Sequence, residues 1–197
     1  TGTWYSGDAP AKSNEDLELN LHLGYAVWSK DGADWSDPTL LDGTFGHYDW
    51  RAAAYGKKAF LCGRRKIGFE VGPKGEPDKI ESLMLESDDG LIWRKRATFQ
   101  ETMGDETAFL FEHNGDILGV GRRRGTAQLL RSQPPYEKWQ RINLDRHIGG
   151  PLIVKWGART VVGGRHSTEN GPKTSMCWLV GNELHEFAEL PSGGDNS

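Results

Sequence analysis

The sequence predicts an all-β protein, a β-propeller of four-stranded antiparallel blades, with about three and a half blades in this chain. Short apolar, β-branched and aromatic runs alternate with Gly, Asp-Gly and Asn-Gly along nearly the whole sequence. Amphipathic helical spacing is not sustained anywhere. A turn that opens with Ser recurs at spacings of 58, 45 and 43 residues, close to the roughly 40–50 residues of one propeller blade. The four serines are Ser29, Ser87, Ser132 and Ser175.

The composition indicates one globular domain that spans residues 1–197. The net charge of −4 is too small to favour nucleic acid or an anionic membrane surface as a partner. No apolar run reaches transmembrane length, and no signal peptide pattern precedes the first strand. Cys62 and Cys177 each lie in an apolar strand-like run, which predicts buried free thiols. No Cys/His/Asp spacing resembles a metal site, so we expect neither metal nor cofactor.

The strands group into hairpins. Residues 2–5 and 24–41 form an opening half unit, and three complete units follow. In each unit, one hairpin supplies strands one and two, and the next supplies strands three and four. The paired hairpins are residues 50–64 with 80–98, 107–122 with 127–143, and 151–165 with 174–190.

The pattern Ser-x-Asp-Gly-x-x-Trp occurs twice and joins strand three to strand four. Gly supplies a positive-φ turn position, Asp accepts backbone N–H bonds, and Ser adds a further hydrogen bond. Trp is expected to pack between neighbouring sheets. The pattern therefore predicts a structural turn, not a catalytic device. Its residues are Ser29, Asp31, Gly32 and Trp35, then Ser87, Asp89, Gly90 and Trp93; the copies at Ser132 and Ser175 are degenerate.

Propeller topology places the candidate site on the opposite face, where strand one begins and strand two ends. Strand two ends in Gly-Arg in three successive units. One such Arg would be an ordinary surface charge, but three at equivalent positions in a concave site favour an anionic ligand. His47 and His166 are expected to be hydrogen-bonded loop residues. The charged residues and the histidine that we expect at this rim are Asp49, Arg51, Arg64, Arg65, Asp105, Glu106, Arg122, Arg123, Arg124, Arg165, His166 and Asp195.

The two complete turns resemble the Asp boxes of the sialidase superfamily of β-propellers, also called BNR-repeat proteins. Further segments are similar to a sialidase-like branch, and together the resemblance covers most of the chain. These segments are "DWR" (49–51), "GDETAFLFEHNGDILGVGR" (104–122), "RSQPPYEKW" (131–139), "IGGPLIV" (148–154) and "LPSGGDNS" (190–197).

The resemblance implies a glycan ligand and a secreted or periplasmic protein. Sialidase-like proteins bind a sugar carboxylate with an arginine cluster, and they hydrolyse through a Tyr nucleophile backed by a Glu, with an Asp as acid/base. The planar guanidinium grips a carboxylate in a two-pronged fork. Carried over to this chain, the resemblance implies Glu106 and Asp49 as catalytic residues. It implies Arg51, Arg64, Arg122, Arg165, His166 and Asp195 as substrate-binding residues.

Two functions stay open at this point. The first is a sialidase-like glycoside hydrolase, of the exo-glycosidase kind, that acts on an acidic or polar glycan. The second is a non-catalytic, lectin-like propeller, because the sequence contains no Arg-Ile-Pro motif and no Tyr in a C-terminal nucleophile context. A protein-binding scaffold is a third option. Since propellers close with about four to eight blades, we expect this chain to be part of a five- or six-bladed propeller or to close with a second chain.

Overall fold

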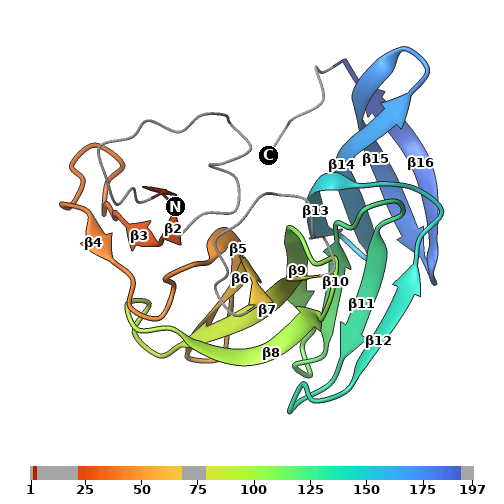
Figure 1. Cartoon of the computed structure of the whole chain (residues 1–197). Coiled ribbons are helices and arrows are strands. Elements are labelled where there is room, and N and C mark those ends of the chain that lie inside the picture. Colours follow the sequence, from red (N-terminus) through yellow and green to blue (C-terminus); the bar gives the residue numbers. More distant parts are fainter. Residues whose placement is uncertain (1, 4–21, 68–78, 192–197) are drawn as a thin grey trace.

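The computed structural model describes residues 2–3, 22–67 and 79–191, and in these residues the regular structure is β-strand without α-helix. The strands form three four-stranded antiparallel sheets and two two-stranded sheets (Figure 1). The all-β prediction and the four-stranded antiparallel unit are therefore confirmed. The two-stranded sheets pair β1 (Gly2–Thr3) with β2 (His22–Leu23), and β3 (Tyr25–Ala26) with β4 (Thr39–Leu40).

Each four-stranded sheet is a run of consecutive hairpins in chain order. The first sheet contains β5 (Tyr48–Tyr55), β6 (Lys58–Lys66), β7 (Ile80–Ser87) and β8 (Arg94–Gln100). The second contains β9 (Thr107–Phe111), β10 (Ile117–Gly121), β11 (Gln128–Ser132) and β12 (Trp139–Asn143). The third contains β13 (Gly149–Trp156), β14 (Arg159–Thr168), β15 (Gly171–Val180) and β16 (Glu183–Leu190).

The sheets follow one another along an arc. Strand β9 packs beside both β5 and β13, so the first strands of the three sheets are neighbours. Figure 1 shows this arc running from β3 and β4 at one end to β13–β16 at the other, and it is open between these ends. The first strand of each sheet therefore lines the inner side of the arc, as the propeller prediction requires.

Apolar side chains fill the two gaps between successive sheets. Phe60, Met84 and Phe99 of the first sheet pack against Phe109 and other residues of the second. Val120 and Leu129 of the second sheet pack against residues such as Val162 of the third. The alternation of strand side chains gives each sheet two apolar faces, so one sheet contributes to two cores.

The Ser-x-Asp-Gly-x-x-Trp turns have the hydrogen bonds that the sequence predicts. Asp89 Oδ1 accepts the backbone N–H groups of Leu91 and Ile92 at 2.8 and 2.9 Å. The hydroxyl of Ser87 accepts the N–H of Gly90 at 2.8 Å, and Gly90 has a φ of 78°. Asp31 accepts the N–H groups of Ala33 and Asp34 at 2.9 and 3.0 Å. Hydrogen bonding within the turn lowers the pKa of Asp31 and of Asp89.

The degenerate copy at Ser132 keeps part of this geometry. Trp139 Nε1 donates to the carbonyl of Tyr136 at 3.0 Å, as Trp93 Nε1 donates to the carbonyl of Gly90 at 3.1 Å. Tyr136 has a φ of 65°, so it occupies the turn position that Gly holds in the complete copies. The copy proposed at Ser175 is wrong, because this residue lies within β15 and pairs with Gly164 of β14.

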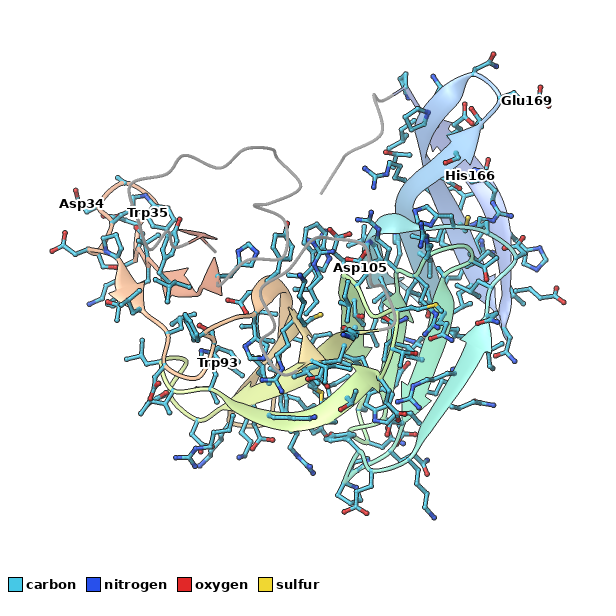
Figure 2. The ribbon with its side chains drawn as sticks, in the orientation of Figure 1. Asp34, Trp35, Trp93, Asp105, His166 and Glu169 are labelled. Carbon is cyan, nitrogen blue, oxygen red and sulfur yellow. The ribbon has the colours of Figure 1, made fainter. Side chains whose placement is uncertain are left out.

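The two tryptophans of the complete turns have different surroundings. Trp93 is 7% exposed and packs with Leu61, Leu83 and Leu41. Trp35 is 61% exposed, which corrects the expectation that both rings pack between sheets. The physical reason is that Leu41, just after β4, packs beside Trp93, whereas Trp35 belongs to none of the core clusters of the described residues. Figure 2 shows Trp35 at this end of the arc.

Both cysteines are buried free thiols, as predicted. In the part of the chain that the structure describes, no helix is long and apolar enough to cross a membrane.

Candidate functional site

The candidate site lies at the edge where the first strand of each sheet begins and the second strand ends. Tyr48 pairs with Arg64, and Gly149 pairs with Arg165. In the second sheet, the N–H of Arg122 donates to the carbonyl of Glu106 at 2.8 Å. The three Gly-Arg arginines therefore occupy equivalent pairing positions in the three sheets.

A chain of charged groups links the three sheets at this edge. A guanidinium nitrogen of Arg64 donates to Asp105. Asp105 also lies 3.3 Å from Arg122 Nε, and Arg122 donates to Glu106 Oε2 at 2.8 Å. Glu106 Oε2 then accepts the backbone N–H of Gly150, in the third sheet, at 3.2 Å. Because these groups are half-buried or buried, their alternating charges stabilise one another more than exposed pairs would.

The third arginine lies against the backbone of its own sheet. A Cβ added at Gly149 would lie 3.0 Å from two guanidinium nitrogens of Arg165. Glycine at this position therefore lets the guanidinium approach the start of β13, the same segment whose Gly150 N–H binds Glu106.

Asp49 occupies a different environment on the neighbouring inner strand. Neither carboxylate oxygen of Asp49 has a hydrogen-bond partner in the described structure, and both are buried. A Cβ at Gly24 would lie 2.6 Å from Asp49 Oδ2, so the backbone before β3 covers the carboxyl group closely. Burial raises the pKa of Asp49 to about 7. The group is thus able to hold and release a proton near neutral pH.

Further buried polar atoms surround the start of β5. Both ring nitrogens of His47, the indole nitrogen of Trp50 and Nε of Arg51 have no hydrogen-bond partner among the described residues. His47 is 3% exposed, and the backbone of Thr44 and Phe45 interacts with its ring without hydrogen bonds of good geometry. Burial, with a smaller contribution from the charge of Arg65, lowers its pKa to about 4. Unpaired buried polar groups are costly, and they concentrate where a ligand or strain gives them a use.

Aromatic rings support the arginine of the first sheet. The guanidinium of Arg64 lies 4.5 Å from the ring centroid of Tyr48, an arrangement in which the ring face attracts the cation. Tyr48 in turn stacks on Trp50 at 6.3 Å and meets His22 edge-on at 5.4 Å. These residues hold Arg64 at the rim.

The structure brings together only part of the predicted set. Arg64, Arg122 and Glu106 share one network, and Asp49 lies near the start of the adjacent inner strand.

The guanidinium of Arg51 lies 5.2 Å from the ring centroid of Trp50, and the structure shows no contact between Arg51 and this network. His166 Nδ1 lies 4.0 Å from Glu186 instead. Asp195 lies outside the described residues.

Asp105 is the residue whose role the sequence did not reveal. It was one of many charged rim positions, but in the structure it contacts both Arg64 and Arg122, and its Oδ1 accepts the N–H of Glu106 at 2.8 Å. The sequence feature that could have pointed to this role is the position of Asp105 two residues before β9, the first strand of the second sheet. Figure 2 shows Asp105 near the centre of the arc and His166 farther along β14.

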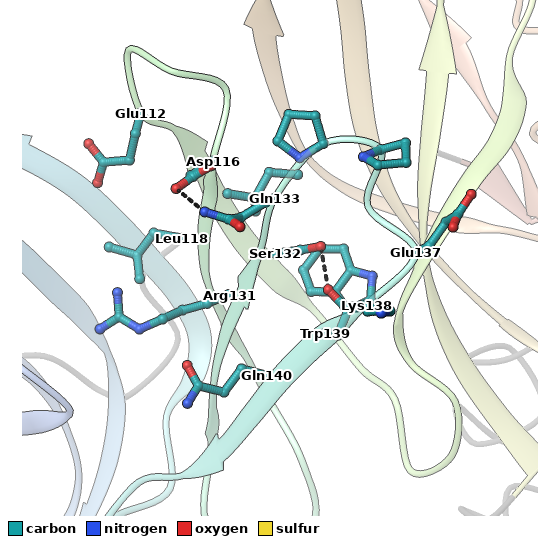
Figure 3. A pocket seen from close by; sticks show the side chains of 13 residues that line it. Glu112, Asp116, Leu118, Arg131, Ser132, Gln133, Glu137, Lys138, Trp139 and Gln140 are labelled. Atoms are coloured by element: carbon teal, nitrogen blue, oxygen red, sulfur yellow. Dashed lines mark hydrogen bonds between the residues drawn. The ribbon is translucent and has the colours of Figure 1, made fainter.

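A cavity of about 970 Å³ lies at the other end of the second sheet (Figure 3). Its lining includes Glu112 and Asp116 from the β9–β10 connection and Trp139 from β12. Its main polar groups are already paired, since Arg131 donates to the carbonyl of Gly181 at 2.7 Å and Gln133 donates to Asp116 at 3.2 Å. This cavity is separate from the rim and contains none of the predicted site residues. In the described residues, no group of three His, Cys, Asp or Glu side chains could hold a metal ion.

The arrangement of the sheets is that of a propeller-like fold, and comparison with solved structures supports this class of fold. Neither a protein-family model nor a curated protein sequence matches the chain. The structure is similar to a phage phi92 endosialidase, with a TM-score of 0.58 and 12% identity over 78% of this chain. It is also similar to Zg3597, a family 117 glycoside hydrolase of Zobellia galactanivorans, with a TM-score of 0.59 and 11% identity over 86% of this chain.

A third similar structure is the α-L-arabinanase of Cellvibrio cellulosa, with a TM-score of 0.54 and 12% identity over 86% of this chain. The chain spans 28% of the endosialidase, 62% of Zg3597 and 73% of the arabinanase. At these identities the likeness concerns the fold.

Proposed function

We propose that this chain carries the ligand-binding rim of a sialidase-like glycoside hydrolase that acts on an acidic or polar glycan. Asp49 is the acid/base, Glu106 is the second carboxylate of the reaction, and Arg64, Arg122 and Arg165 bind the anionic part of the ligand. The turns that begin at Ser29 and Ser87 are structural Asp boxes in this proposal, and the intact propeller has five or six blades.

The observation that carries the proposal is the contrast between the two carboxyl groups. Asp49 is buried without a hydrogen-bond partner in the described structure, and its pKa is about 7. Glu106, at the start of the adjacent inner strand, is ion-paired with Arg122 at 2.8 Å. Glycoside hydrolysis requires one carboxyl group that donates a proton and one that acts as a carboxylate. Two carboxyl groups on adjacent inner strands in such different environments support this division of roles.

The arginines supply recognition of a negative charge. Arg64 and Arg122 share Asp105 in the ligand-free protein, so a ligand carboxylate entering the rim would find two forked donors already oriented. The solved structures with a similar fold include an endosialidase and an α-L-arabinanase complexed with arabinohexaose. The arginines favour an acidic ligand for this chain.

A lectin-like function is the alternative, and one contact favours it. Glu106 Oε2 is already engaged by both Arg122 and the N–H of Gly150. A carboxylate held in this way is well suited to fix the rim, with or without a catalytic role.

Hydrolysis of an aryl sialoside and of a panel of neutral aryl glycosides tests the proposal. We expect turnover that Asp49→Asn and Glu106→Gln each abolish. The exposed Glu101, which follows β8 and pairs with Arg141 of β12 at 3.4 Å, provides the control Glu101→Gln with unchanged turnover. Saturable binding of a sialoside without any turnover would support the lectin-like function, and the absence of both binding and turnover would refute both.

A further inference from the structure

The position of Asp105 at the rim depends on the segment 101–106, which joins β8 to β9. Gly104 of this segment lies directly on the first sheet. Its N–H donates to the carbonyl of Ile80 at 2.8 Å, and a Cβ at Gly104 would lie 2.4 Å from the backbone nitrogen of Ser82. The segment is therefore fixed to the start of β7 at the residue just before Asp105.

A buried amide side chain makes the next contact of this segment. Gln100, the last residue of β8, is fully buried, and its Oε1 accepts the backbone N–H of Asp105 at 3.3 Å. Gln100 Nε2 donates to Oε1 of Gln128 in the second sheet at 3.2 Å, and Gln128 Nε2 donates to Oδ1 of Asn143 at 3.1 Å. A chain of amide groups therefore connects Asp105 with β11 and β12 of the second sheet.

The second sheet leaves space for the Gln100 amide. A Cβ at Gly121, the last residue of β10, would lie 2.8–2.9 Å from three atoms of this amide group. Gly121 is the glycine of the Gly-Arg pair that contains Arg122. A Cβ at the equivalent Gly63 would lie 3.0–3.2 Å from the side chain of His47. In both sheets, the glycine before the arginine admits a side chain from the segment that leads into the sheet.

Arg123 ties the same segment to the second sheet. Its Nη1 donates to the carbonyl of Thr102 at 2.9 Å and to Oε1 of Gln128 at 3.4 Å. An amide group donates and accepts through separate atoms and carries no charge. The buried amide chain therefore fixes the segment without disturbing the charge balance of the rim, and breaking it would leave buried polar groups unsatisfied.

We infer that Gln100 is a positioning residue, which fixes Asp105 and, through Asp105, the orientation of the Arg64 and Arg122 guanidinium groups. Asp105 contacts Arg64 and lies 3.3 Å from Arg122 Nε, so a shift of the segment reaches both arginines. The role of Gln100 in ligand binding rests on the proposed function, whereas its hold on Asp105 does not.

The NMR signal of the Arg122 Nε–H group in the ligand-free chain tests this role, because this group faces Asp105. Gln100→Met keeps a side chain of similar length but removes both hydrogen bonds. It should move the signal in the same direction as Asp105→Asn. Gln133→Met, which removes a hydrogen bond to Asp116 at the other end of the second sheet, is the matched control and should leave the signal in place. If Gln100→Met lowers the free energy of unfolding without moving the signal, Gln100 is only structural and the inference is wrong.

A double variant shows whether Gln100 acts through Asp105. In the Asp105→Asn chain, adding Gln100→Met should not shift the Arg122 signal further, because the carboxylate that Gln100 positions is already gone. A further shift would contradict the inference.

Gly121→Ala gives a second test if Gln100→Met does not fold. Gly121 has no positive φ, so alanine suits its backbone, and the new Cβ would displace the flexible end of Gln100. Amide hydrogen exchange at Asp105 should then accelerate roughly 3–10-fold, the scale of one net hydrogen bond. Unchanged exchange would overturn the positioning role.

Calorimetry with a sialoside tests the link to the proposed function. Gln100→Met should weaken binding, because the two guanidinium groups lose their fixed orientation, and Gln133→Met should bind like the parent. A parent chain that binds no sialoside refutes the proposed function, whereas an unchanged Arg122 signal refutes the positioning role, so the two failures are distinguishable.

Discussion

Asp49 and His47 lie two residues apart, and burial shifts their pKa values in opposite directions. The pKa of Asp49 rises to about 7, and that of His47 falls to about 4. In both cases burial disfavours the charged form of the side chain, which is the anion for Asp and the cation for His. The start of β5 therefore holds two groups that are neutral over much of the acidic range.

These shifts make opposing contributions to stability. Between about pH 4 and pH 7, Asp49 binds more protons in the folded than in the unfolded chain, so its contribution to the free energy of unfolding falls as pH rises. Neutral His47 contributes stability that is fully present above about pH 6.5 and is lost as pH falls toward about 4. The two effects largely cancel between pH 4 and pH 6.5.

Replacing Asp49 by Asn should expose the contribution of His47. The stability of Asp49→Asn relative to the parent should increase by about 3–4 kcal/mol between pH 4 and pH 8, the free energy that corresponds to a pKa moving from its ordinary value to about 7. Urea unfolding at a series of pH values measures this difference. Asp34→Asn, at an exposed position, should follow the parent at every pH. A constant difference between Asp49→Asn and the parent would show that the pKa of Asp49 is the same in the folded and unfolded chains.

Arg165 offers a direct test of the anion site. Arg165→Ala should weaken binding of an anionic glycan by about 2–5 kcal/mol, the range for removing one member of a desolvated charge pair. Arg165→Lys should recover only part of this loss, because lysine keeps the charge but not the fork. Calorimetry with a sialoside measures both. Equal affinity of the alanine variant and the parent would exclude Arg165 from the site.

At the scale of the element, the two complete turns have the same sequence pattern, but their tryptophans should differ in how much they contribute to stability. Trp93→Ala should lower the free energy of unfolding by about 3–5 kcal/mol, because it removes a ring that is buried between apolar side chains. Trp35→Ala should change it by about 0.5 kcal/mol or less at concentrations where the chain is monomeric. Chemical unfolding of both variants checks this, and similar losses would mean that Trp35 is covered in solution.

The two complete turns also show which features of an element can be predicted from the sequence. The turn is local, so Ser, Asp and Gly at fixed spacing were enough to predict its hydrogen bonds. The environment of Trp35 depends on what lies beside its hairpin, and no residue of the turn encodes that. Strand pairing was likewise predictable, but the irregular register between Asp49 and Ala52 in β5 was not. This bulge covers Trp50 and Arg51, and the side-chain alternation of a regular strand cannot be extrapolated across it.

For the whole molecule, the sequence predicted the edge at which the site lies better than the contacts within it. The repeated Gly-Arg ends placed Arg64, Arg122 and Arg165 at equivalent positions, because blade topology fixes where second strands end. The role of Asp105 depends on Arg64, 41 residues earlier in the chain, approaching it across the gap between sheets. Such a contact arises from packing of two sheets and leaves no local pattern.

The shared carboxylate of Asp105 couples the effects of substitutions at the rim. Arg64 belongs to the first sheet and Arg122 to the second, yet both contact the same side chain. Substitutions of groups that share a partner are not additive, so loss of one arginine alters the hold on the other. Under the proposed function, ligand preference at this rim would therefore be a collective property of two sheets. Selection or engineering that aims at a new ligand would have to exchange the arginines and Asp105 jointly, because stepwise replacement passes through intermediates with an unbalanced buried charge.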